Sequence, residues 1–117
     1  MLVLTSEEQF QRIFIDEKPS AAAIVFLAEW CAPSRRQKPV MEAIADEYAG
    51  RAVLASIDVD ALESLADRLE IRTLPCLVLF ANGEQVEMLA GYQQDGYIRD
   101  FLDAMIAAGE AQKPQLP

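Results

Sequence analysis

The sequence predicts a single α/β domain with a mixed five-stranded sheet, in which a parallel core carries an antiparallel hairpin at one edge and four helices flank the sheet. Two observations predict it. Apolar runs of strand length alternate with segments whose apolar residues recur at helical spacing, as is typical of parallel sheets covered by helices on both faces. An Asn-Gly pair between two later strand patterns indicates the hairpin. We expect residues 1–108 to form the domain and 109–117 a C-terminal tail.

The first quarter of the chain is expected to hold a short strand, a helix and a buried strand. Residues 2–4 are apolar and are followed by Thr5, with Glu8 three residues later, which is the pattern of a capping box. Phe10, Ile13 and Phe14 then recur at the spacing of a helix of about ten residues. Residues 21–28 are continuously apolar, which is typical of a strand buried on both faces.

A second helix is expected to begin just after Cys31. Pro33 suits a first helical turn, where its missing N–H costs nothing. Apolar residues recur at helical spacing from Val40 onward, and Gly50 is expected to cap the end of this helix. Pro39 inside the helix predicts a kink.

The second half of the chain repeats the alternation and then adds the hairpin. Residues 52–59 are a predicted strand, and Asp60 with Glu63 predicts a second capping box before a short helix. Residues 77–80 and a returning strand, marked by the alternation over 85–88 and ended by Gly91, are predicted to form the hairpin around Asn82-Gly83. A final helix is predicted from the stripe of apolar residues that begins at Tyr97.

Composition excludes several classes of function. Histidine is absent, and two cysteines do not make a metal set, so we expect no metal and no cofactor. The net charge of −9 disfavours nucleic acid and anionic membranes as partners. No apolar run approaches the roughly 20 residues that span a bilayer. Because the N-terminus lacks the basic flank of a secretory signal, a cytoplasmic protein is expected.

Cys31 is the candidate reactive group. It stands where a buried strand is followed by a helix, and the N–H groups and dipole of a helix N-terminus stabilise a thiolate there. Arg35, Arg36 and Lys38 follow closely and add positive charge, unless their side chains point outward. The alternative is a small buried cysteine without a chemical role.

The residues around Cys31 resemble a known family. Trp30-Cys31-Ala32-Pro33-Ser34 is similar to the thioredoxin active-site segment, Trp-Cys-Gly-Pro-Cys. The resemblance covers about residues 1–107. Its further matches are the helix proline Pro39, the loop Thr73-Leu74-Pro75, the hairpin Asn82-Gly83, and Gly91. It implies the thioredoxin fold and a role in thiol–disulfide exchange.

Three departures from the thioredoxin pattern agree with one another. Ser34 replaces the second, resolving cysteine, and a hydroxyl cannot form a disulfide. Val25 and Ser56 stand where thioredoxins have a buried aspartate and a lysine, which assist proton transfer at that resolving cysteine. The resemblance therefore implies a protein with a single reactive thiol, in which the Ser34 hydroxyl can donate a hydrogen bond to the Cys31 thiolate.

The resemblance also implies which residues bind a client. Pro75 is expected to be cis and to lie against Cys31, leaving the Leu74 backbone free to pair with an extended peptide. Trp30 is expected to be an exposed platform beside the thiol, or else to pack beneath the loop. The expected substrate-binding residues are Trp30, Ala32, Pro33, Leu74 and Pro75.

Cys76, directly after Pro75, is a possible second thiol. It is expected to be a buried core residue, with two alternatives: a resolving role in which it pairs with Cys31, or a reactive thiol that stays unpaired. The carboxylates Glu29, Asp58 and Asp60 are expected to be surface or capping groups near the strand ends.

Three hypotheses for the function follow. In the first, Cys31 alone reduces, isomerises or captures protein disulfides or glutathione mixed disulfides. An external thiol such as glutathione then releases the bound client from Cys31. The protein is expected to be a monomer or a weak dimer. The second is a non-catalytic protein-binding module on the same scaffold. The third is a two-cysteine thioredoxin carrying an engineered cysteine-to-serine change at Ser34.

Overall fold

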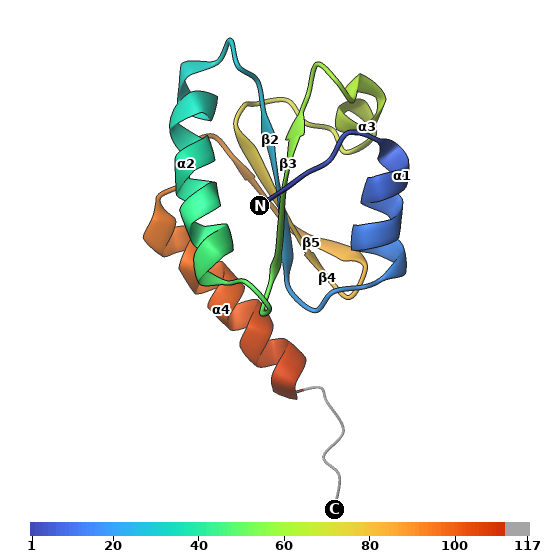
Figure 1. Ribbon diagram of the computed structural model, residues 1–117, viewed down its shortest axis with the longest axis vertical. Helices are drawn as coiled ribbons and strands as arrows, with labels where there is room; N and C mark the ends of the chain where they lie inside the picture. The colour runs from blue at the N-terminus through green and yellow to red at the C-terminus, as the bar shows by residue number, and fades with distance from the viewer. Residues whose placement is uncertain (112–117) are drawn as a thin grey trace, which may run out of the picture.

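The five strands form one mixed sheet in the order β1-β3-β2-β4-β5 in this computed structural model, which describes residues 1–111 (Figure 1). Strands β1, β3 and β2 run parallel, whereas β4 is antiparallel to both β2 and β5. The predicted fold class, with its parallel core and its hairpin at one edge, is confirmed. The strands are β1 (Leu2–Val3), β2 (Ala22–Leu27), β3 (Val53–Asp58), β4 (Cys76–Ala81) and β5 (Glu84–Ala90).

Helices cover both faces of the sheet, with α2 and α4 on one side and α1 and α3 on the other (Figure 1). Helix α1 continues directly into a π-helical segment, η1, so the two together make the single N-terminal helix that was predicted. The bounds are α1 (Glu7–Phe10), η1 (Gln11–Asp16), α2 (Ala32–Glu47), α3 (Glu63–Arg68) and α4 (Asp95–Ala111). None of the helices among residues 1–111 combines the length and the apolar composition needed to traverse a bilayer.

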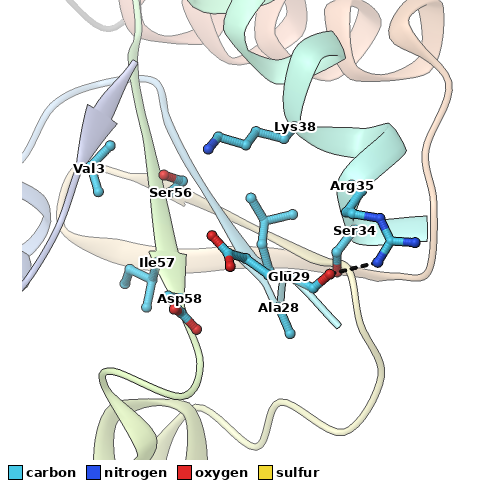
Figure 2. Close-up of a pocket in the computed structure, with 10 residues that line it drawn as sticks. Val3, Ala28, Glu29, Ser34, Arg35, Lys38, Ser56, Ile57 and Asp58 are labelled. Carbon is cyan, nitrogen blue, oxygen red and sulfur yellow. Dashed lines mark hydrogen bonds between the residues drawn. The ribbon is translucent and has the colours of Figure 1, made fainter. Parts of the chain in front are cut away.

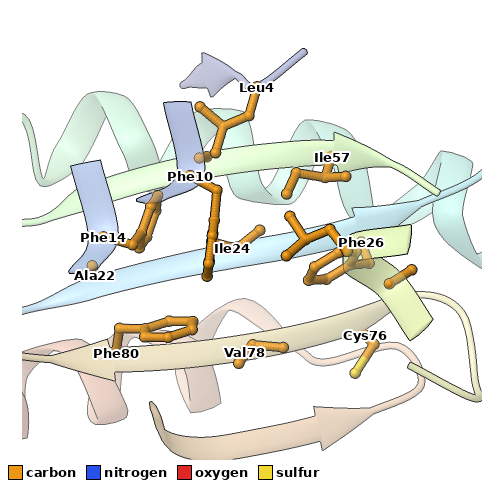
Figure 3. Packing of buried hydrophobic residues seen from close by; sticks show 13 residues of the cluster. Leu4, Phe10, Phe14, Ala22, Ile24, Phe26, Ile57, Cys76, Val78 and Phe80 are labelled. Atoms are coloured by element: carbon orange, nitrogen blue, oxygen red, sulfur yellow. The ribbon is translucent and has the colours of Figure 1, made fainter. Parts of the chain in front are cut away.

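Two apolar cores lie on opposite faces of the sheet. Because successive side chains of a strand point to opposite faces, β2 contributes Ile24 and Phe26 to one core and Val25 and Leu27 to the other. We call the core under α1, η1 and α3 the first core; Figure 3 shows its aromatic side chains Phe10, Phe14 and Phe80 around the strands. The second core lies under α2 and α4 and includes Met41 and Ile44.

The first helix is capped one residue later than predicted. Ser6, not Thr5, is the N-cap: its hydroxyl accepts from the backbone N–H of Gln9, and the Gln9 side chain accepts from the backbone N–H of Ser6. Gln9 Oε1 also accepts from the Thr5 backbone N–H at 2.7 Å, so one side chain satisfies two backbone donors. Both Thr-x-x-Glu and Ser-x-x-Gln fit the pattern, and the tertiary structure decides between them.

The capping box predicted at Asp60 is wrong. Helix α3 begins at Glu63 with Leu62 as its N-cap, and Leu62 makes no side-chain capping bond. The Asp60 carboxylate instead accepts a hydrogen bond from the Trp30 indole, and Asp58 accepts from the Asp60 backbone N–H. The spacing of Asp60 and Glu63 fits a capping box, but local spacing carries no information about a partner thirty residues away.

The two long helices end at other residues than predicted. Helix α2 contains Pro39 as expected and ends at Glu47, before Gly50; its kink stays a prediction. Helix α4 extends through Gly109 to Ala111, beyond the boundary set at residue 108. A Cβ atom at Gly109 would lie 2.9 Å from Ser20 Cβ, so glycine allows α4 to pass close to that loop. Residues 112–117 of the predicted tail lie outside the described residues.

The predicted hairpin is confirmed. Asn82 and Gly83 connect β4 to β5, and both have positive φ, +55° and +84°. A two-residue turn of this kind requires positive φ at both central positions, which is why Asn-Gly suits it.

Candidate active site

The Cys31 thiol lies at the N-terminus of α2, as predicted. After β2 the chain makes a turn in which the Cys31 N–H donates to Ala28 O at 3.1 Å. Cys31 is the N-cap residue, and its carbonyl accepts the first helical hydrogen bond, from Arg35 N–H, at 3.1 Å. Its side chain is half-buried. The thiol therefore lies beside the free N–H groups of a sixteen-residue helix and within reach of solvent.

This environment lowers the pKa of the Cys31 thiol below its ordinary value. Hydrogen bonding from the Ser34 hydroxyl is the largest cause, followed by hydrogen bonding from the Ser34 backbone N–H. Partial burial opposes both of these effects, and the positive charges of Arg35 and Arg36 support them. A larger fraction of this thiol is therefore ionised near neutral pH than of a free cysteine.

The protonated thiol has a different partner. Cys31 Sγ lies 3.6 Å from the carbonyl oxygen of Leu74, within reach of a weak S–H donor. In this arrangement the Ser34 hydroxyl is buried and has no hydrogen-bond partner among the described residues. A buried hydroxyl without a partner is costly, so ionisation of Cys31 supplies the acceptor that Ser34 lacks.

The loop before β4 lies against the thiol, as expected. The Leu74–Pro75 peptide bond is cis, which confirms the prediction for Pro75. Leu74 is half-buried and Pro75 is buried. On the far side of this loop, Gly91 N–H donates to Pro75 O at 2.8 Å, so the residues that follow β5 border the same loop.

Trp30 is exposed rather than packed beneath the loop. Its side chain is 68% exposed, and its indole N–H donates to the Asp60 carboxylate at 2.8 Å. The hydrogen bond holds a large apolar ring at the surface beside Cys31. Ala32 is exposed and Pro33 is half-buried in the first turn of α2, so the residues around the thiol form an accessible apolar surface.

Among residues 1–111 no aspartate or glutamate is buried, and behind the site the carboxylates of Glu29 and Asp58 line a cavity from exposed positions. Val25 and Ser56 are direct neighbours in the β2–β3 register, and both are buried. Next to them lies a cavity of about 240 Å³ lined by residues that include Ser34, Lys38 and Ser56 (Figure 2). In Figure 2 Lys38 extends toward Ser56, whereas Arg35 donates to Glu29 O at 2.6 Å. Three basic residues were expected to favour the thiolate. The charges of Arg35 and Arg36 lower the pKa of Cys31, whereas Lys38 lines the cavity.

The structure places Cys76 in the first core, away from solvent. Its side chain packs with Phe26 and Val78 (Figure 3), and burial raises the pKa of its thiol. Neither cysteine of residues 1–111 is in a disulfide. A protonated thiol surrounded by apolar side chains supports the core role expected for Cys76.

Gln37 is a buried polar residue that the sequence analysis missed. It is 2% exposed, and its amide pairs with the backbone of Gln93 at both ends. The signal was present: the buried face of α2 follows helical spacing back from Ile44 and Met41 to Gln37 and Ser34. Two polar residues on a buried stripe indicate groups with specific partners.

The described residues do not suggest a metal centre. No three His, Cys, Asp or Glu side chains among residues 1–111 are grouped so that they could hold an ion.

The sheet order, the cysteine at the start of α2 and the cis-proline beside it together define a class of fold and site, that of the thioredoxins. The thioredoxin family model matches residues 1–104. Thioredoxin C-2 from Corynebacterium nephridii is 33% identical over 105 residues, which cover 90% of this chain and 96% of that protein. A Staphylococcus haemolyticus thioredoxin is 36% identical over 78 residues, covering 67% and 75% of the two chains. The chain belongs to the thioredoxin family.

Solved thioredoxin structures have the same fold as this protein. A mutant thioredoxin from Halobacterium salinarum superposes with a TM-score of 0.81 at 30% identity, covering 99% of this chain and 93% of that one. The thioredoxin of Malassezia sympodialis gives a TM-score of 0.80 at 28% identity and covers 91% and 90%. The protein thus has the thioredoxin fold, and it is a thioredoxin-family redox protein.

Proposed function

We propose that the protein exchanges disulfides through Cys31 alone. One observation carries the proposal: a half-buried thiol with a lowered pKa begins helix α2, and the residue one helical turn later is Ser34. The thiolate supplies the nucleophile, and no second sulfur stands where an intramolecular attack would begin. Cys76 is buried in the first core, which supports the assignment of the chemistry to a single sulfur.

The exchange takes three steps. In the first, the Cys31 thiolate attacks one sulfur of a client disulfide, a new Cys31–client disulfide forms, and the other client sulfur leaves as a thiolate. In the second, an external thiolate attacks the Cys31 sulfur of that mixed disulfide. The client leaves as a thiolate, and Cys31 is left in a disulfide with the external thiol. A further molecule of the same thiol then restores the Cys31 thiolate and leaves as a symmetric disulfide.

Residues next to Cys31 suit an extended polypeptide client. The exposed ring of Trp30 and the first-turn residues Ala32 and Pro33 offer apolar contact area. We expect the Leu74 backbone before cis-Pro75 to pair with a peptide in strand-like fashion. We propose protein disulfides and glutathione mixed disulfides as substrates and glutathione as the external thiol, with the cytoplasm as the location.

Mixed-disulfide formation tests this function directly. A Cys76→Ala variant is incubated with oxidised glutathione and its intact mass is followed. We expect one glutathionyl group on Cys31, removed by reduced glutathione, and none in the Cys31→Ser, Cys76→Ala protein. An unmodified Cys31 would contradict the proposal and favour the protein-binding module, whose biological activity would survive Cys31→Ser.

Ser34→Cys provides the matched gain of function. A cysteine one turn after Cys31 is expected to release the client by forming an intramolecular disulfide, so release no longer depends on added glutathione. If release from the Ser34→Cys protein still required an external thiol, residue 34 would not be the missing resolving position.

A further inference from the structure

We propose that Gln37 is a positioning residue for polypeptide clients: its buried amide fixes residues 91–93 relative to the helix that carries Cys31. The inference rests on the proposed function and goes beyond it, because it names a residue that distinguishes polypeptide disulfides from small disulfides. Gln37 itself touches no reacting atom.

The amide of Gln37 is matched to a single backbone unit. Gln37 Oε1 accepts from Gln93 N–H at 2.7 Å, and Gln37 Nε2 donates to Gln93 O at 3.1 Å. Gln37 shares its face of α2 with Met41 and Ile44, which belong to the second core. An apolar residue there would leave a donor and an acceptor of the Gln93 backbone without a partner, and unpaired backbone groups destabilise the arrangement that holds them.

The same loop is bonded onward to the cis-proline loop. The Gln93 side chain donates to Ala90 O and to Gly91 O, each at 3.2 Å. Gly91 N–H donates in turn to Pro75 O at 2.8 Å, and Leu74 O lies 3.6 Å from Cys31 Sγ. A closed ring of contacts therefore runs from α2 through residues 91–93 and the cis-proline loop back to the thiol at the start of α2.

This ring fixes one border of the surface next to the thiol. Within it Tyr92 is 42% exposed, so the loop that Gln37 holds presents an aromatic side chain to solvent. A polypeptide that pairs with Leu74 extends past Cys31 and meets the neighbouring loop. A small disulfide needs only the thiol. Loss of the Gln37 amide is therefore expected to impair polypeptide clients and to spare small ones.

The test compares two disulfides in the Cys76→Ala background. Gln37→Met keeps the length of the side chain and removes the amide, and Ile44→Val is the control for stability, since it shortens a buried residue of the same helix and second core. Gln93→Ala removes the onward bonds to Ala90 and Gly91. Each variant is assayed with insulin as the polypeptide disulfide and with oxidised glutathione as the small one.

We expect Gln37→Met to lower the rate constant for capture of insulin about tenfold, the equivalent of one or two hydrogen bonds. Its rate with oxidised glutathione and the pH profile of Cys31 alkylation should be unchanged. Gln37→Met and Gln93→Ala should be non-additive toward insulin, because both open one ring. Ile44→Val should behave as wild type with both disulfides.

Two outcomes would overturn the inference. Capture of insulin at the wild-type rate by both Gln37→Met and Gln93→Ala would show that the loop needs no positioning. Equal slowing of both disulfides by Gln37→Met would show a general effect on the thiol instead. A protein with wild-type sequence at positions 37 and 93 that reacts with neither disulfide contradicts the proposed function itself, which separates the two failures.

Discussion

At the scale of single residues, Cys31 owes its character to its backbone position and to Ser34. The helix N-terminus provides N–H groups, and Ser34 provides both its own N–H and a hydroxyl that is otherwise buried without a partner. A serine at this position therefore does more than abolish an intramolecular disulfide. It stabilises the charged form of the one reactive sulfur.

Ser34→Ala is expected to raise the pKa of the Cys31 thiol toward its ordinary value, because the largest cause of the lowering is removed. The rate of alkylation by iodoacetamide, followed against pH in the Cys76→Ala background, measures this. Since only the thiolate reacts, the midpoint should move to higher pH and the rate at neutral pH should fall.

Ser56→Ala is the matched control, since Ser56 is also buried and lines the same cavity but is not among the causes of the shift. Its alkylation midpoint should stay at that of the parent protein. An unmoved midpoint in Ser34→Ala would leave the helix N-terminus and the arginines as the whole cause.

At the scale of elements, a π-helical hydrogen bond and aromatic contacts hold η1 against the sheet. Glu17 N–H donates to Arg12 O, the i to i−5 bond of a π-helix, at 2.9 Å. The Phe14 ring lies 5.9 Å from that of Phe10 and 5.6 Å from that of Phe80, and Phe14 is fully buried (Figure 3). The aromatic contacts join the first helix to the central part of the sheet.

Phe14→Ala is expected to lower the free energy of unfolding by about 3–5 kcal/mol, because it removes a buried ring and leaves a cavity between three elements. Urea denaturation measures the change. Phe101→Ala serves as the comparison: that ring is only half-buried in α4, so its loss should cost clearly less. Equal costs would mean that η1 repacks around the missing ring.

A hydrogen bond joins Tyr48, the C-cap residue of α2, to helix α4, and the donor hydroxyl of this bond is titratable. Tyr48 OH donates to Asp103 Oδ1 at 2.6 Å, and burial together with that carboxylate raises the pKa of Tyr48 from 10 to about 12. Because the folded-state pKa lies above the unfolded one, the stabilisation is complete below pH 10 and is lost as pH rises toward 12.

Tyr48→Phe tests that linkage. The variant is expected to be less stable than wild type at pH 8, by about 1.5–3 kcal/mol for a hydrogen bond to a charged acceptor. The difference should shrink as pH rises from 10 to 12. Urea denaturation at a series of pH values measures it, and a difference that stayed constant across this range would show that Tyr48 keeps its proton independently of the fold.

At the scale of the whole molecule, the sheet separates two cores that share the strands but not the side chains. Alternation along β2 sends neighbouring residues to opposite faces, so each helical layer packs on its own set of side chains. The active site lies where β2 passes into α2, and the stripe of α2 that carries Ser34 and Gln37 continues into the second core.

The losses of stability caused by substitutions in different cores should therefore be additive. Phe14 lies in the first core and Ile44 in the second. The loss of stability in the Phe14→Ala, Ile44→Val double variant should equal the sum of the single losses within about 0.5 kcal/mol, because the sites share no partners. Phe10→Ala combined with Phe14→Ala should depart from additivity, since these rings are in contact. Coupling between Phe14 and Ile44 as large as that between the two rings would show that the sheet transmits packing changes.

The sequence by itself determined the α/β class, every strand, the hairpin turn and the thiol at a helix N-terminus. These features depend on local periodicity, on positive φ at Asn82 and Gly83, and on the order of strand and helix, all of which are encoded by neighbouring residues. It also singled out Ser34 and Pro75 by resemblance, and the cis bond and the position of Ser34 beside the thiol agree with that.

Only the tertiary structure decided which polar groups pair across the fold. In the folded protein Ser6, not Thr5, caps the first helix. Asp60 accepts a hydrogen bond from Trp30 instead of capping α3, and Gln37 pairs with the backbone of Gln93. Each choice depends on a partner that the chain brings close only after folding, or on two local patterns that fit equally well. Hydrogen bonds require donors and acceptors within about 3 Å, and the order of residues along the chain does not specify such distances between residues far apart in sequence.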